Sequence, residues 1–226
     1  MATPDFEKSS KLATQLLYEQ NLENRILDIQ TCNYPGKTIL FESIQNYALL
    51  VRRPISDFIS EGNKTLKDGC TLVLGNNMYL VLYNAEINNW EHLNWTLAHE
   101  IGHIYLDHTD DGPIEEIEAH FFAAQFFMPE YSLWMASREH GMLTSEDLME
   151  IYGVSELAAL KRLGTCRRKA LFRGDTIDKK IWEQQKYRVD LYFQCKEDGV
   201  PYRFELENYL DTKYECEHYM LQLLTT

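Results

Sequence analysis

The stretch LAHEIGHIYLDH (97–108) carries two histidines four residues apart, His99 and His103, and Glu100 directly follows the first. On an α-helix, residues i and i+4 lie on one face about 6 Å apart, so both imidazoles can bind one metal ion. Glu100 lies beside them and can reach a water molecule activated by that ion, which is the general-base arrangement of zinc hydrolases. The pattern predicts two metal ligands and a catalytic glutamate.

Two further residues of this stretch predict what surrounds the metal site. Gly102 lies inside a helical run with buried apolar residues, where glycine costs about 1 kcal/mol relative to alanine. We therefore expect another element to approach the helix closely at Gly102. Asp107, four residues after His103, continues the histidine stripe and is a candidate to orient a ligand histidine from outside the ligand set.

Zinc held by two helical histidines usually takes a third protein ligand and keeps one position for water. The next helical run, IEEIEAHFFAAQFFMP (114–129), offers Glu115, Glu116 and Glu118. Glu116 shares its face with small and apolar residues, whereas Glu118 shares its face with a more polar set. The pattern favours Glu116 as the ligand and predicts that Glu115 and Glu118 form a solvated acidic first turn.

His120 lies one turn after Glu116 and leaves two alternatives open. It can hydrogen-bond the Glu116 carboxylate, or it can replace that carboxylate as the third ligand. The pattern favours the first alternative, but the tilt of the helices decides between them.

The segments before the histidine stretch predict helices and one hairpin. Residues 5–60 are mainly helical in pattern. In CTLVLGNNMYLVLYN (70–84), two β-prone runs flank Gly75–Asn77, which is the signature of a β-hairpin. Asn88 and Asn89 then offer N-caps for a helix that runs to about Asp107.

The segments after it predict helices and a second hairpin. Pro113 suits a first helical turn and Pro129 ends the run, so the two helices joined by the short link should be antiparallel neighbours. Residues 144–163 predict two short helices around Gly153. YRVDLYFQC and PYRFELENY are β-prone runs separated by an Asp-Gly pair, which predicts a C-terminal β-hairpin.

The composition of the chain argues against several classes of protein. Five widely spaced cysteines without a CxxC pair argue against a disulfide framework and against a cysteine zinc site. The formal net charge of −13 disfavours nonspecific attraction to nucleic acid or anionic lipid. The chain has no apolar run of membrane-spanning length and no signal-peptide pattern at its start, so we expect a cytoplasmic protein without membrane association.

TLAHEIGHIYLDH (96–108), followed by EIEAHFFAAQFFMP (116–129), resembles the ImmA/IrrE family of zinc metallopeptidases. That family's pattern is roughly T-L-A-H-E-x-G-H-x-x-x-x-H and then E-x-E-A-N-x-F-A-A-x-L-L-M-P. Two separate motifs agree in order and detail, and LMEIYGVSELAALKRL (148–163) resembles the family's next stretch. The sequence departs from the family pattern at two places. His120 stands where the family has Asn, and HLNW (92–95) stands where the family often has arginines.

The resemblance implies an α+β fold with a mainly helical, zincin-like metallopeptidase core and a small β-sheet or hairpin before the HExxH helix. Carried over residue by residue, it makes His99, His103 and Glu116 the ligands of one Zn²⁺ and Glu100 the catalytic residue. The expected domains are an N-terminal helical region (1–65), the peptidase core (66–180) and a hairpin-containing extension (181–226).

Members of the family are linked to regulated proteolysis of helix-turn-helix repressors, on mobile genetic elements and in stress responses. The resemblance therefore implies an intracellular endopeptidase of narrow specificity, with a DNA-binding repressor or a similar regulatory protein as its partner. The acidic chain suits a basic substrate protein.

A rival hypothesis starts from the pair of helices in 144–163, which is similar to a helix-turn-helix and leads into a basic stretch. Residues 161–180 hold eight Lys or Arg against two Asp. The alternative is a metal-binding transcriptional regulator, or a partner-binding module of a mobile element or toxin–antitoxin type, without protease activity. Because phosphate contact calls for a broader basic surface, we expect no direct nucleic-acid binding.

Overall fold

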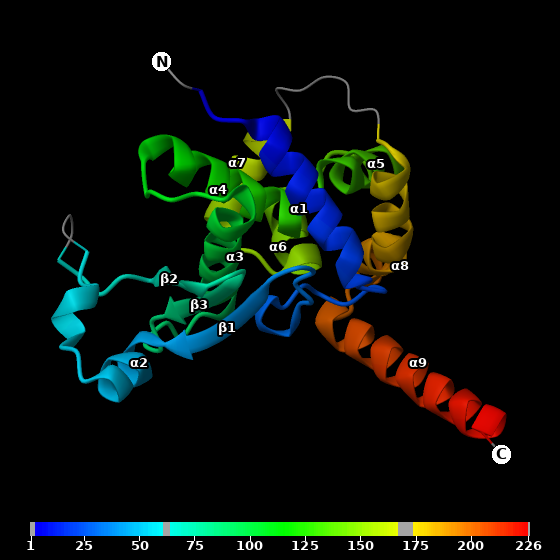
Figure 1. The fold of residues 1–226 in the computed structure, drawn as a ribbon. Coiled ribbons are helices and arrows are strands. Elements are labelled where there is room, and N and C mark those ends of the chain that lie inside the picture. The colour runs from blue at the N-terminus through cyan, green and yellow to red at the C-terminus, as the bar shows by residue number, and fades with distance from the viewer. Residues whose placement is uncertain (1–2, 61–63, 167–173, 226) are drawn as a thin grey trace. The chain divides into compact units, whose positions relative to one another are not determined.

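The computed structural model describes residues 3–60, 64–166 and 174–225. These residues form a mainly helical α+β structure with nine α-helices, two 3₁₀ helices and one three-stranded sheet (Figure 1). The chain divides into two compact units, Met1–Gln20 with Leu27–Pro129, and Asn21–Ile26 with Glu130–Thr226. None of the described helices has the length and apolar composition that a membrane span requires.

The first unit contains the sheet, whose strands are β1 (Thr38–Ser43), β2 (Gly69–Gly75) and β3 (Met78–Tyr83) in the order β1-β3-β2. β2 and β3 form the predicted antiparallel hairpin, and Asn77 takes a left-handed conformation at its turn. β1 pairs with β3 in parallel, inside a region whose pattern is mainly helical. The hairpin prediction is confirmed, and β1 is an addition to it.

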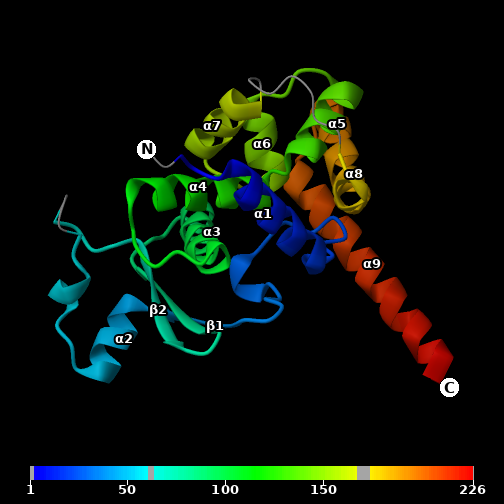
Figure 2. The ribbon, with the colours of Figure 1, turned by 45° about the horizontal axis from the view of Figure 1, so that its top comes forward.

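The described residues of the first unit also form the helices α1 (Phe6–Gln20), α2 (Ile44–Val51), α3 (Trp90–Leu106) and α4 (Pro113–Phe127), of which α2 and α3 pack against the sheet. Figure 2 shows α3 between α4 and the sheet, and α1 packs against both α3 and α4. The two short 3₁₀ helices are η1 (Ile29–Thr31) and η2 (Ile55–Phe58). As predicted, Asn89 caps α3, Pro113 begins α4, and the short link makes the two helices neighbours.

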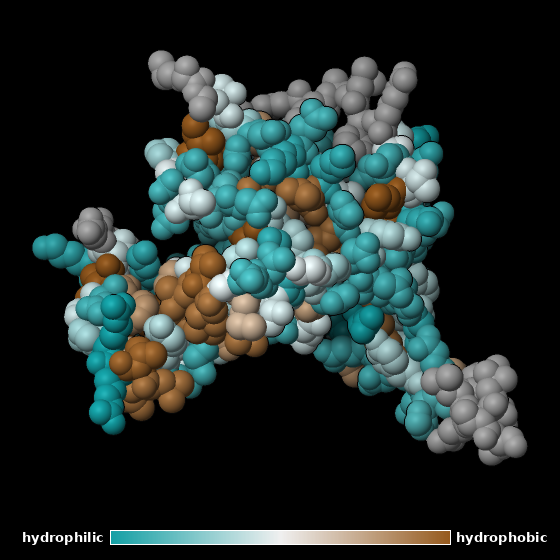
Figure 3. Space-filling view, viewed as in Figure 1, coloured by the Kyte–Doolittle hydropathy of each residue, from teal (hydrophilic) through white to brown (hydrophobic). Residues whose placement is uncertain are grey.

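The two faces of the sheet have different neighbours, because successive side chains of a strand point to opposite faces. Leu72 and Leu80 pack with the apolar cluster of α2 and η2, which contains Ile44 and Phe58. Thr71, one residue before Leu72, points to the other face and reaches α3. Figure 3 shows apolar side chains gathered at the surface over α2 and the sheet, where Leu49 is 81% exposed.

The described residues of the second unit form five helices and the short segment 21–26. They are α5 (Glu130–His140), α6 (Ser145–Tyr152), α7 (Glu156–Cys166), α8 (Thr176–Asp198) and α9 (Tyr202–Thr225). α8 packs against α5, α6 and α9. The predicted break at Gly153 is confirmed, since this glycine ends α6 in the left-handed conformation.

The predicted C-terminal β-hairpin is wrong, because both β-prone runs are helical. The buried residues of α8 recur at helical spacing, with Gln185, Arg188, Val189, Tyr192 and Cys195 on one face. The Asp-Gly pair does not form a hairpin turn. Gly199, with φ +68°, instead ends α8 as a left-handed C-cap.

The basic stretch behind the rival hypothesis lies partly in α7 and α8. Arg162 is 2% exposed, so it is not available for phosphate contact. Residues 167–173, which hold four of the eight basic side chains, lie outside the described residues. The described part therefore offers few of the cations that this hypothesis needs.

Candidate metal centre

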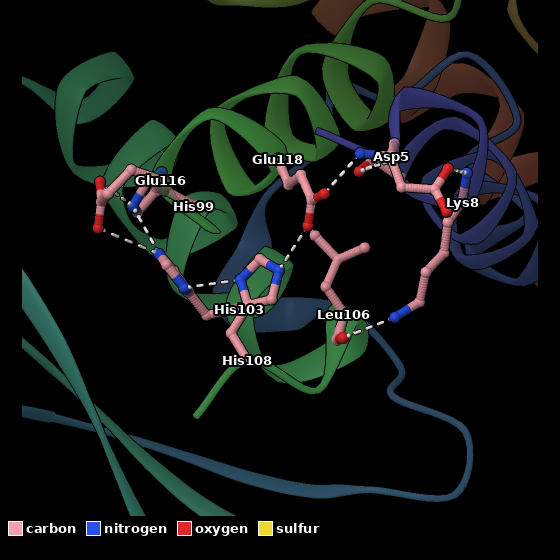
Figure 4. Close-up of polar contacts among 9 residues, drawn as sticks. Asp5, Lys8, His99, His103, Leu106, His108, Glu116 and Glu118 are labelled. Atoms are coloured by element: carbon pink, nitrogen blue, oxygen red, sulfur yellow. Dashed lines mark hydrogen bonds and ion pairs between the residues drawn. The ribbon is translucent and has the colours of Figure 1, made fainter. Parts of the chain in front are cut away.

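His99 and His103 on α3 and Glu116 on α4 point their donor atoms toward a common centre (Figure 4). The Nε2 atoms of the two histidines lie 3.1 Å apart. The Glu116 carboxylate oxygens lie 3.3 Å from Nε2 of His99 and 3.5 Å from Nε2 of His103. One donor atom from each residue lies within 4.8 Å of the others, and two imidazole nitrogens with one carboxylate oxygen form a donor set that suits a metal ion.

The close approach of α3 and α4 at Gly102 brings Glu116 to the histidines. A Cβ atom at Gly102 would lie 3.1 Å from the carbonyl oxygen of Ala119 and 3.2 Å from its Cα. Both are backbone atoms of α4, so a larger residue would press the two helices apart. The predicted close contact at Gly102 is confirmed, and its partner is α4.

The protonation states at this centre suit a cation. Burial, together with the neighbouring His99, lowers the pKa of His103 to about 4. A hydrogen bond from His99 is the main cause that lowers the pKa of Glu116 to about 2. At neutral pH His103 is therefore neutral and Glu116 is ionised, which are the forms that bind a metal.

Glu100 lies in the same cleft and is held from the sheet side. The Thr71 hydroxyl donates a hydrogen bond of 2.7 Å to its Oε2. Burial raises the pKa of Glu100, while the bond from Thr71 opposes this shift. β2 comes this close because Gly69 has no side chain. A Cβ there would lie 2.8 Å from Cγ2 of Thr96 and 3.3 Å from Cγ of Glu100.

The metal centre opens into a cleft of about 1020 Å³ between the edge strand β2, the segment before it, and helices α3 and α4. Its lining includes the four residues His99, Glu100, His103 and Glu116. The other acidic residues of the lining are Asp57, Asp68, Asp107, Asp110 and Asp111, and the basic residues, besides histidine, are Arg53 and Lys67. Without a bound cation, the residues that line the cleft therefore carry a net negative charge.

The two remaining candidate residues, His120 and Asp107, both lie outside the three-residue cluster. The His120 ring lies 4.3 Å from the His99 ring and lines the cleft, but His120 is not part of the three-residue cluster. Asp107 ends α3 with φ +59°, its side chain is 77% exposed, and its carboxylate lies 3.6 Å from Nζ of Lys37. Its described ion pair is thus with Lys37 and not with a ligand histidine.

His108 and Glu118, for which the sequence predicts no role at the metal centre, are linked to His103. Nδ1 of His108 lies 3.0 Å from Nδ1 of His103, and Nε2 of His108 lies 2.9 Å from Oε2 of Glu118. The Glu118 side chain is 13% exposed, so the prediction that it is solvated is wrong. The available signal was His108 itself, which directly follows Asp107 at the end of α3 and matches the last histidine of the family pattern.

The sequence model of the IrrE N-terminal-like domain, peptidase family M78, matches residues 32–164 of the chain. The match contains the three clustered residues and Glu100, and it confirms the resemblance to the ImmA/IrrE family. The chain belongs to this family and is by class a metallopeptidase. No curated protein matches the chain.

Proposed function

We propose that this protein is a zinc-dependent, cytoplasmic endopeptidase of narrow specificity that cleaves a DNA-binding repressor or a similar regulatory protein. The observation that carries the proposal is the cluster of His99, His103 and Glu116, with Glu100 in the same cleft. These residues fit one zinc ion, because they offer two imidazoles and one carboxylate and leave the cleft side open.

His99, His103 and Glu116 would hold the ion. Zinc supplies Lewis acidity, which polarises the scissile carbonyl and makes water acidic enough to be a nucleophile at neutral pH. Glu100 accepts the proton of the attacking water and delivers it to the leaving amine. Its buried position raises the pKa of the carboxyl and makes it a stronger base, and Thr71 keeps the carboxylate oriented.

The shape of the cleft supports an extended peptide as substrate. β2 is an edge strand of the described sheet, and its residues Gly69 to Val73 line the cleft. An extended peptide can pair with such an edge through main-chain hydrogen bonds. The aspartates of the lining favour a positively charged segment, as found in DNA-binding proteins.

The proposal is tested with Glu100→Gln, assayed with a candidate repressor by gel electrophoresis and with zinc by metal analysis. We expect one zinc per chain in both proteins and loss of cleavage in the variant. Glu115→Gln, a change of the same kind on α4, is the matched control and should cleave normally. Full repressor inactivation by Glu100→Gln would instead favour the alternative of a partner-binding module without protease activity.

A further inference from the structure

His103 uses both of its ring nitrogens in described contacts. Its Nε2 faces the metal centre, and its Nδ1 lies 3.0 Å from Nδ1 of His108 (Figure 4). Nε2 of His108 continues to Oε2 of Glu118 at 2.9 Å. The side chains of His108 and Glu118 are 8% and 13% exposed, so little water competes for these contacts.

In the series of contacts from His103 through His108 to Glu118, only one arrangement of protons is compatible with metal binding. A metal-binding His103 is neutral and offers the lone pair of Nε2, so its proton is on Nδ1. That N–H donates to Nδ1 of His108, which must then be the acceptor. His108 therefore carries its own proton on Nε2 and donates it to Oε2 of Glu118.

We propose that His108 and Glu118 are positioning residues that hold the His103 ring in the orientation and tautomer required for the metal. This inference rests on the metal site of the proposed function but not on the peptidase activity. Hydrogen bonds of this kind to the far nitrogen of a ligand histidine raise its basicity and fix its ring. Here a second histidine stands between the ligand and the carboxylate.

Asp5, directly before α1, and Lys8 in α1 complete this support. The backbone N–H of Asp5 donates to Oε1 of Glu118 at 2.5 Å, so both carboxylate oxygens have a partner. Nζ of Lys8 donates to the carbonyl oxygen of Leu106 at 2.8 Å and ties α1 to the end of α3. Asp5 and Lys8 precede the residues that match the family, 32–164, so these contacts come from outside the matched range.

Of the two histidines, His103 has a partner at its Nδ1 atom, but His99 has none among the described residues. Nδ1 of His99 is buried and has no hydrogen-bond partner among the described residues. We therefore expect the position of His103 to depend on its outer contacts more strongly than that of His99.

The test is the zinc affinity of the full chain, measured by competition with a chromophoric chelator and without any peptide substrate. His108→Leu removes the acceptor of His103, and we expect zinc to bind about 10–100-fold more weakly. His108→Asn keeps an acceptor oxygen close to the place of Nδ1 and should recover part of this loss. Glu118→Gln keeps an acceptor but loses the charge and should bind zinc less tightly than the wild type. Glu115→Gln is the matched control and should bind like the wild type.

Rescue by asparagine separates positioning from packing, because leucine and asparagine are similar in size but only asparagine accepts the His103 proton. The proposal is overturned if Glu118→Gln and either His108 variant both bind zinc as tightly as the wild type. It is also overturned if His108→Asn and His108→Leu bind zinc with equal affinity. If His108→Leu does not fold, His108→Asn and Glu118→Gln decide, each checked by the thermal unfolding of its metal-free form. Since no peptide is present, a failure of the proposed peptidase function leaves this result interpretable.

Discussion

The hydroxyl of Thr71 on the edge strand β2 donates a 2.7 Å hydrogen bond to Oε2 of Glu100 on α3. The bond crosses from the strand expected to bind substrate to the residue expected to transfer the proton. It also opposes the effect of burial, which raises the pKa of Glu100. The sheet thereby acts on the chemistry of the site, although all three residues that would hold the metal lie on helices.

Thr71→Val should lower kcat/KM for cleavage of the substrate by about 10-fold or more. A hydrogen bond to a charged group is worth about 1.5–3 kcal/mol, and without it the Glu100 carboxylate can rotate away from the water. Zinc content should not change, because Thr71 touches none of the three clustered residues through a described hydrogen bond. Thr71→Ser keeps the hydroxyl and should keep most of the activity. Equal activities of the valine and serine variants would contradict this role.

Gly102→Ala should destabilise the protein by about 1–3 kcal/mol, in spite of the higher helix propensity of alanine. The added Cβ would lie 3.1 Å from the carbonyl oxygen of Ala119 and would push α4 away from α3. Because Glu116 lies on α4, zinc affinity should fall as well. Denaturant unfolding and chelator competition measure the two effects.

Gly164→Ala is the control for this change, since a Cβ at Gly164 meets no atom within 4 Å among the described residues outside its own stretch of helix. Both glycines lie in helices, α3 and α7. The control should be more stable than the wild type by up to about 1 kcal/mol and should bind zinc normally. A Gly102→Ala variant that behaves like the control would contradict the close packing of α3 and α4.

Asp178→Asn should stabilise the protein at neutral pH but not in acid. Burial is the main cause that raises the pKa of Asp178 to about 6; the backbone hydrogen bond from Asp175 opposes this shift, and the charges of Asp175 and Glu130 add to it. A carboxyl whose folded-state pKa lies above its unfolded value favours folding fully only below the unfolded pKa. This contribution is lost as the pH rises through about 6.

The stability difference between Asp178→Asn and the wild type should thus be small below about pH 4 and reach about 1–3 kcal/mol above pH 7. Asparagine can still accept the hydrogen bond that the Asp175 N–H donates to the Asp178 carboxylate, which is 3.0 Å long. Thermal unfolding across this pH range measures the difference. A difference independent of pH would contradict the raised pKa.

Local signals in the sequence were sufficient for the elements that position the site. The hairpin β2–β3 is set by its turn residues, α3 begins at its Asn89 cap, and α4 begins at Pro113. β1 was not predictable in this way, because its partner β3 lies about 40 residues later and the pairing is parallel. The C-terminal helices were mistaken for strands because Tyr, Val and Phe favour β-structure, while the spacing of the buried residues is helical.

The residues of the site also fall into those that local spacing predicts and those that it does not. His99, Glu100 and His103 follow from the spacing of one helix, and Glu116 follows from the stripe of the next helix and from the resemblance. Asp107 was expected beside the histidines because its helical spacing continues theirs. The helix ends at this residue in a left-handed turn, so Asp107 faces Lys37 and His108 takes the place behind His103. A periodic pattern cannot show where a helix stops to within one residue.

The most direct test of the account is the zinc content and affinity of Glu116→Ala beside His120→Asn. Glu116 belongs to the cluster with His99 and His103, whereas His120 lies beside the cluster and stands where the family has asparagine. We predict that Glu116→Ala loses zinc during dialysis against a weak chelator, while His120→Asn keeps one zinc per chain. Full zinc retention by Glu116→Ala, with loss in His120→Asn, would contradict the ligand set on which the account rests.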